Sequence, residues 1–202
     1  MVNKFSSAFH LAVIYALFFI LIGLAYMFSI MLHVPIEHFS ADPAMTYQAH
    51  PFTGFLSNIG VLIWAFTATI CLFSYVVIIH NEKNTHSNYL LFAGLLTFFL
   101  CLDDLFMLHE GIFPWHLRIP QTVVYVIYLI LFGSFFLYYF KHIVTGEYII
   151  LLIALLFLGA SAVGDFVLPQ EGLCYFIEDT LKLFGIGTWF AYYFRYSLLQ
   201  LL

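Results

Sequence analysis

Charged residues are scarce in this chain. Asp, Glu, Lys and Arg make up only 8% of its 202 residues, and Lys and Arg together number 6. A water-soluble domain has roughly 25% charged residues, and a nucleic-acid-binding surface needs clustered basic ones, so both classes are excluded. The 3 cysteines are odd in number and lack C-x-x-C spacing, so neither a disulfide framework nor a thiolate metal site is indicated.

Long apolar runs take the place of charge, since 64% of the residues are hydrophobic. One crossing of a bilayer needs about 20 consecutive apolar residues. The sequence therefore predicts an all-α integral membrane protein in which 1–202 form a single transmembrane domain, a six-transmembrane-helix bundle. The predicted spans cover 9–32, 55–79, 89–112, 120–140, 148–168 and 173–199.

Basic residues in the connections predict the orientation of these spans, because Lys and Arg are retained on the cytoplasmic side. With six spans, Lys4, Lys83, Lys141 and Arg195 fall on one face, whereas the opposite face has only Arg118. Both termini are therefore expected in the cytoplasm. Residues 33–54 then form an outer loop, for which a solvated loop and a lid over a site both stay open.

Carboxylates occur inside the predicted spans, where each charge costs about 2.5–3.5 kcal/mol. The orientation brings them to one layer in the outer half of the membrane, with Ser57 and Asn58 as supporting residues at a similar depth. The ionisable residues of this layer are Asp103, Asp104, His109, Glu110, Asp165, Glu178, Asp179 and Lys182.

Helical geometry predicts which of these residues share a face. On a continuous helix, Asp103 and Glu110 lie about 20° apart, and His109 lies about 100° to one side of them. Glu178 and Lys182 form an i,i+4 pair on the last span. This number of carboxylates cannot all be ionised together in the low-dielectric interior of a membrane. A bound metal, shared protons or a water-filled vestibule must therefore neutralise them.

The residue types favour a metal site, because Asp, Glu and His are ligands of Zn, Fe and Mn in proteins. No G-x-S-x-G or H-E-x-x-H motif is present, and no pattern for an organic cofactor is seen. The predicted metal ligands are Asp103, Asp104, His109, Glu110 and Asp165. The predicted catalytic residues are Glu178, Asp179 and Lys182, with a free carboxylate as general base.

The segments FLCLDDLFMLHEG and FIEDTLKLFG resemble a small uncharacterised family of bacterial multi-pass membrane proteins. Its members have a D-[D/E]-x-x-x-x-H-E helix and a later E-[E/D]-x-x-[E/K]-x-x-G helix. The resemblance implies that the two acidic helices form one unit and that the protein lies in a bacterial inner membrane. The layout is also similar to membrane metal hydrolases of the alkaline ceramidase and adiponectin receptor type. The chain lacks their late H-x-x-x-H element and seventh helix.

Together these features favour a metal-dependent membrane enzyme, a hydrolase or an oxidoreductase, that acts on a lipid or another apolar small molecule. Two alternatives stay open. One is a proton- or cation-coupled transporter or ion-conducting subunit, and the other is an accessory subunit of a membrane complex. Membrane lipids are the expected surroundings, a homo-oligomer or larger membrane complex is compatible with the sequence, and no nucleic-acid partner is expected.

Overall fold

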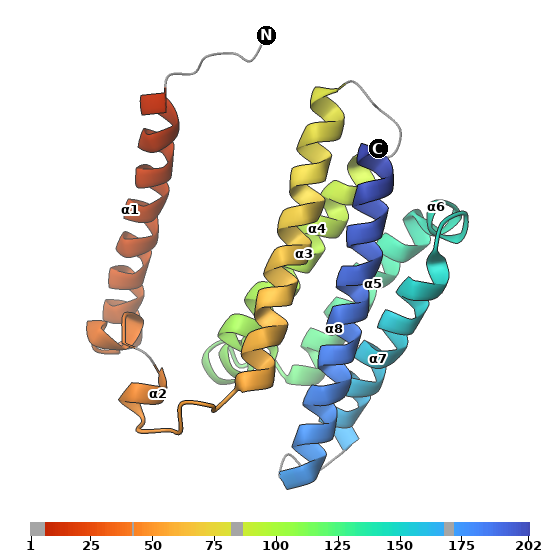
Figure 1. The fold of residues 1–202 in the computed structure, drawn as a ribbon. Coiled ribbons are helices and arrows are strands. Elements are labelled where there is room, and N and C mark those ends of the chain that lie inside the picture. The colour runs from red at the N-terminus through yellow and green to blue at the C-terminus, as the bar shows by residue number, and fades with distance from the viewer. Residues whose placement is uncertain (1–6, 42, 82–86, 168–171) are drawn as a thin grey trace. The chain divides into compact units, whose positions relative to one another are not determined.

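The computed structural model describes residues 7–41, 43–81, 87–167 and 172–202, in which helices are the only regular elements. The described residues form eight α-helices and two short helices of other types, which confirms the all-α prediction. The chain divides into two compact units, Met1–Thr53 and Gly54–Leu202 (Figure 1). Each unit is described by itself.

The first unit consists of one long apolar helix and two short ones. Helix α1, Ser7–Leu32, has no charged residue, and its large side chains are exposed, as for Phe19 at 75%. The predicted outer loop contains the 3₁₀ helix η1, Ile36–Phe39, and the single turn α2, Pro43–Thr46. Pro35 precedes η1 and Pro43 begins α2, in agreement with the fixed φ of proline at helix starts.

The second unit is a helical bundle. It contains α3 (Phe55–His80), α4 (Ser87–Phe106), η2 (Leu108–His116), α5 (Gln121–Tyr138), α6 (Phe140–Val144), α7 (Tyr148–Val167) and α8 (Gly172–Leu201). Helix α8 packs along both α3 and α7, and α3 also packs along α4 (Figure 1). The acidic residues of α4 and α8 are thereby brought into one bundle.

Five of the described helices are long and apolar enough to cross a membrane. They are Leu11–Leu32, Phe55–His80, Ser87–Phe106, Gln121–Tyr138 and Tyr148–Asp165. The chain is therefore a multi-pass membrane protein by length and composition. Helix α8, which corresponds to the sixth predicted span, is not among them, although it is 30 residues long. It contains Glu178, Asp179, Lys182 and Arg195, which lower its apolar character.

The third predicted span, 89–112, is not one continuous helix. Helix α4 ends at Phe106, Met107 has a left-handed backbone with φ 49°, and η2 continues as a π-helix that contains Pro114. Proline lacks the backbone N–H that a regular α-helix requires, which favours an irregular winding here. The predicted angles between Asp103, His109 and Glu110 are therefore wrong, because they assume a regular helix.

The centre of the bundle is aromatic and closely packed. The rings of Trp64 and Trp189 meet edge to face with centroids 5.9 Å apart, and Trp189 Nε1 donates a hydrogen bond to Thr97 at 3.1 Å. Nearer the start of α4, the hydroxyl of Tyr89 lies 3.0 Å from that of Tyr192 and 3.3 Å from that of Tyr193. These pairs satisfy polar groups that are otherwise costly in a buried layer.

An exposed ion pair fixes the connection between α6 and α7 to the second half of α8. Arg195 donates two hydrogen bonds to Glu147, at 2.6 and 2.5 Å. These hydrogen bonds hold the pKa of the Glu147 carboxyl below its usual value. This fork-like geometry is the one that guanidinium and carboxylate groups prefer.

Helices α7 and α8 approach each other closely at Gly185. A Cβ atom added there would lie 2.7 Å from Leu158 Cγ and 3.0 Å from the Leu158 backbone nitrogen. An added Cβ at Gly187, two residues further along, meets nothing within 4 Å. An added Cβ at Gly159 of α7 likewise meets nothing within 4 Å, so of these three glycines Gly185 is the one at a close helix contact.

We expect Gly185→Ala to lower the free energy of unfolding by about 1–3 kcal/mol, because the methyl group meets backbone that cannot move aside. Gly187→Ala is the matched control on the same helix and should stabilise it by up to about 1 kcal/mol through helix propensity. Unfolding in mild detergent, followed by circular dichroism, measures both. Equal effects of the two substitutions would contradict the close approach.

Candidate functional site

The second unit has a cavity of about 660 Å³ between α4, η2, α5, α7 and α8, with Trp64 and Trp189 also in its lining. Every predicted metal ligand lines it, as do two of the three predicted catalytic residues. The ionisable lining residues are Asp103, Asp104, His109, Glu110, Asp165, Glu178 and Lys182, together with Tyr125 and Tyr128. The structure thus brings seven of the eight predicted ionisable residues to one cavity, and their roles as metal ligands and catalytic residues stay predictions.

Asp103 is the most enclosed of these acids and is 3% exposed. Its Oδ1 accepts hydrogen bonds from the Tyr128 hydroxyl at 2.7 Å and from the His109 backbone N–H at 3.1 Å. Its Oδ2 lies 2.7 Å from His109 Nδ1. Asp103 therefore holds both the backbone and the ring of His109, which the break at Met107 brings back toward α4.

His109 is placed between two carboxylates. Its Nδ1 contacts Asp103, and its Nε2 lies 3.1 Å from Glu110 Oε1. The Asp103 side chain is nearly enclosed, whereas that of Glu110 is 43% exposed. A hydrogen bond to a buried carboxylate fixes the orientation of an imidazole ring, so this arrangement can hold a proton and transfer it at Nε2.

Asp104 joins three helices. Its Oδ1 lies 2.6 Å from Lys182 Nζ on α8, and its Oδ2 accepts a hydrogen bond from Trp64 Nε1 on α3 at 2.9 Å. The sequence predicts Glu178 as the neighbour of Lys182 along the helix, and the structure adds Asp104 as an ion-pair partner from α4. A lysine and an aspartate in contact neutralise each other within the membrane layer.

Asp165 joins α7 to α5. It accepts a hydrogen bond from Gln121 Nε2 at 2.9 Å and a short one from the Tyr125 hydroxyl. Gln121, Tyr125 and Tyr128 are spaced i, i+4 and i+7 along α5, so they share one face of that helix. The two tyrosines are not among the predicted site residues. This spacing is the signal that identifies them as partners of the acids.

The remaining predicted residues lie outside the cavity lining. Ser57 is half-buried and Asn58 is exposed, both in the first turn of α3. Asp179 is half-buried on α8. Neither of the predicted supporting residues, Ser57 and Asn58, therefore lines the cavity. Asp179 directly follows the lining residue Glu178 in the chain.

The described residues contain no group of three or more His, Cys, Asp or Glu side chains close enough to hold a metal ion. The acids instead contact tyrosine, tryptophan, lysine, glutamine and histidine groups. The cavity lining includes five carboxylates, one lysine and one histidine. The polar end of the cavity therefore has an excess of acid, which shared protons or a bound cation would balance.

Comparison with known proteins gives a family for this chain. Residues 11–196 match the family described as domain of unknown function DUF8692. No curated protein and no solved structure matches the sequence. The match includes both acidic segments and all the cavity-lining residues. The chain therefore belongs to the DUF8692 family of unknown function.

Proposed function

We propose that this protein is a membrane enzyme that binds a lipid or another apolar substrate in the cavity and acts on the polar end of that substrate. The observation that carries the proposal is one cavity of about 660 Å³ with an apolar wall and a histidine held between two carboxylates. Ligand cavities in proteins typically measure about 300–1,000 Å³ and combine apolar walls with a few polar groups.

The apolar wall fits a chain-like substrate. It includes Leu129 and Phe132 of α5 and Leu155 and Leu158 of α7. From Asp165 to Leu155 the helix rises about 15 Å, at 1.5 Å per residue. That length is about half of the ~30 Å hydrocarbon core of a bilayer. A hydrocarbon chain along this wall would place its polar head beside the acids.

The proposed chemistry is proton transfer by His109. Asp103 orients the ring through Nδ1, and displacement of the half-exposed Glu110 by substrate would leave Nε2 facing the reacting group. Glu178, and Asp179 beside the cavity, are candidate second bases. Lys182, which is paired with Asp104, has further N–H groups, and one of them would donate a hydrogen bond to an oxygen becoming negative in the transition state.

A divalent metal, Zn, Fe or Mn, is the second form of this proposal, in which His109 would bind the metal in place of a proton and the carboxylates of Glu178 and Asp179 would be the candidate bases. His109 and Glu110 supply adjacent nitrogen and oxygen donors at the cavity surface. Such a metal would polarise a substrate oxygen or activate a water. Glu178, which lines the same cavity, is a further candidate ligand by residue type.

We also propose that α8 is a sixth crossing and that both termini are cytoplasmic, as in a bacterial inner membrane protein. Thirty residues of helix are about 45 Å long, which exceeds the hydrocarbon thickness. Glu178 and Lys182 of α8 line the cavity, so their charge is directed away from lipid. The basic residues Lys4, Lys83, Lys141 and Arg195 then share the cytoplasmic side.

The enzyme proposal predicts that His109→Ala lowers turnover by about 10²–10⁴-fold, the usual contribution of general acid–base catalysis. The purified protein is incubated with polar lipids from the host membrane, and changes in lipid classes are followed by mass spectrometry. His116→Ala, an exposed histidine of the same element η2, is the control and should leave turnover unchanged. Unchanged turnover in His109→Ala, or no lipid change with the wild-type protein, would reject an enzyme of this kind.

The metal proposal predicts close to one Zn, Fe or Mn per chain in protein purified in mild detergent without chelator. A His109→Ala/Glu110→Ala variant should lose that metal, whereas His116→Ala should retain it. Elemental analysis, with a melting curve to verify folding, distinguishes these outcomes. Wild-type protein without metal after attempted reconstitution would contradict this part of the proposal and leave proton transfer as the chemistry.

The topology proposal predicts that green fluorescent protein fused after Leu202 fluoresces in a bacterial host, because it folds on the cytoplasmic side. A fusion that ends at Thr53, after the first span, should not fluoresce. Whole-cell fluorescence normalised to fusion abundance measures both. A dark full-length fusion together with a fluorescent Thr53 fusion would reverse the orientation, and a dark full-length fusion alone would favour five crossings.

A further inference from the structure

The cavity lined by the acids (the acidic cavity) is bounded on one side by α5 and α7, which are both candidate membrane spans. Leu129 of α5 and Val163 of α7 line this cavity, yet their side chains are 73% and 62% exposed. Gly159 and Ala162 of α7 are likewise exposed lining residues. Side chains that border the cavity and the surroundings at once mark an opening. The acidic cavity therefore opens at the surface of the bundle between α5 and α7.

The opening lies at the depth of the hydrocarbon layer. Gln121 of α5 donates a hydrogen bond to Asp165 of α7 at 2.9 Å, so these two residues lie at the same level. Leu129 is eight residues after Gln121 and Gly159 is six residues before Asp165, which places them about 12 and 9 Å along their helices from that level. A span of 18 residues is about 27 Å long. The opening is therefore near the middle of both spans, where the surroundings are lipid chains.

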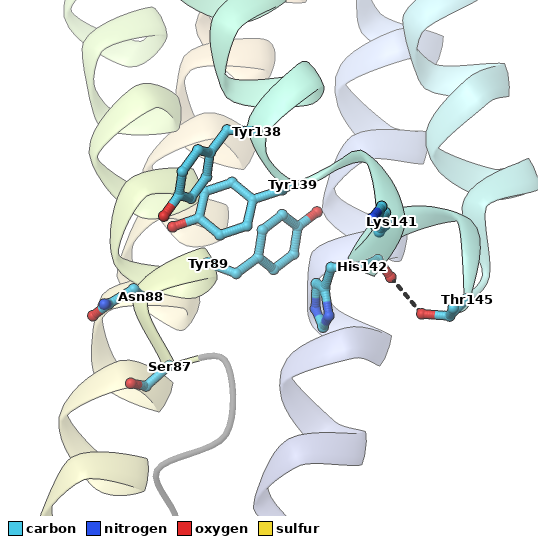
Figure 2. A pocket seen from close by; sticks show the side chains of 8 residues that line it. All are labelled: Ser87, Asn88, Tyr89, Tyr138, Tyr139, Lys141, His142 and Thr145. Atoms are coloured by element: carbon cyan, nitrogen blue, oxygen red, sulfur yellow. Dashed lines mark hydrogen bonds between the residues drawn. The ribbon is translucent and has the colours of Figure 1, made fainter.

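Contacts hold α5 to the bundle on both sides of the opening. Toward its start, the hydroxyl of Tyr125 donates a hydrogen bond to Asp165 of α7. Toward its end, the ring of Phe135 stacks on that of Tyr89 of α4, with centroids 5.6 Å apart. The ring of Tyr139, which follows α5, also lies beside that of Tyr89, at 5.1 Å (Figure 2). The opening is thus framed by formed contacts at each end.

Small residues on α7 leave room in the opening. A Cβ atom added at Gly159 would meet nothing within 4 Å, and Ala162 has only a methyl group as its side chain. The close approach of α7 is to α8, where Leu158 meets Gly185. The tight packing of α7 is therefore directed at α8, and its border with α5 has room for a hydrocarbon chain.

We infer that the substrate enters the acidic cavity sideways from the bilayer, as a membrane lipid with one hydrocarbon chain between α5 and α7. This inference rests on the proposed function and adds the route by which the substrate arrives. The opening is continuous with the apolar wall and with the acids, so the chain can stay in the hydrocarbon layer while its polar end reaches His109 and Glu110. An opening at this depth leads to lipid and gives no access to a water-soluble substrate.

Tryptophan fluorescence in vesicles of brominated lipid tests this inference, because bromine quenches an indole only at close contact. Trp64 and Trp189 line the cavity and are almost fully buried, whereas the exposed Trp115 is replaced by phenylalanine in every protein measured. The full chain is reconstituted in phosphatidylethanolamine and phosphatidylglycerol, with or without bromine at the middle of one acyl chain. The Trp115→Phe parent protein should show strong quenching by the brominated lipids, since only a chain inside the cavity contacts the two buried rings.

A matched pair of substitutions locates the route. Ala162→Phe should remove most of the quenching, because its ring fills the opening. Ala160→Phe adds the same ring at an exposed residue of α7 outside the lining and should leave the quenching unchanged. Both alanines are exposed, so neither substitution adds bulk to the core.

Weak quenching in the parent protein would mean that protein fills the opening, and it would overturn the inference. Equal quenching in the parent and in both alanine variants would overturn it as well. Neither result depends on turnover. Lipid turnover that is lost in His109→Ala, together with an absence of quenching, would therefore reject sideways entry and leave the proposed activity in place.

Discussion

A carboxylate in the low-dielectric layer of a membrane must have a partner, and in this protein the partners come from other helices. Asp104 contacts Lys182 of α8 and Trp64 of α3. Asp165 contacts Gln121 and Tyr125 of α5. These two acids thus have their partners only when the bundle has assembled. The polar contacts therefore favour one arrangement of the helices. Apolar packing alone would define that arrangement less well.

The same requirement shapes the cavity. Asp103 holds Tyr128 of α5 and both the backbone and the ring of His109, so the end of α4, η2 and α5 stay together around it. The left-handed Met107 makes this possible, because it interrupts the regular helix between Asp103 and His109. A regular helix would direct His109 and Asp103 to different sides. The strained residue therefore brings the histidine and its carboxylate together.

Composition and periodicity predict most of the fold. Long apolar runs define α1, α3, α5 and α7 to within a few residues, because a crossing has a fixed length. Charge rarely occurs in spans, so the positions of the acids identify the members of the site. The contacts were not predictable, since Asp104 with Lys182 and Asp165 with Tyr125 join residues distant in sequence. The break at Met107 was missed because apolar composition continues through it, and Pro114 was the available signal.

The packing beneath the acidic cavity bears on whether the acids serve transport or a bound substrate. Trp64 and Trp189 line the cavity and are 2% and 1% exposed. Thr97, which is fully buried, accepts a hydrogen bond from Trp189. This polar contact joins α4 to α8. A solute that crosses the bundle at this layer would have to separate the rings of Trp64 and Trp189. The close packing contacts between them would then be lost. A substrate that enters and leaves beside the acids disturbs none of it, so the packing favours binding and chemistry over conduction.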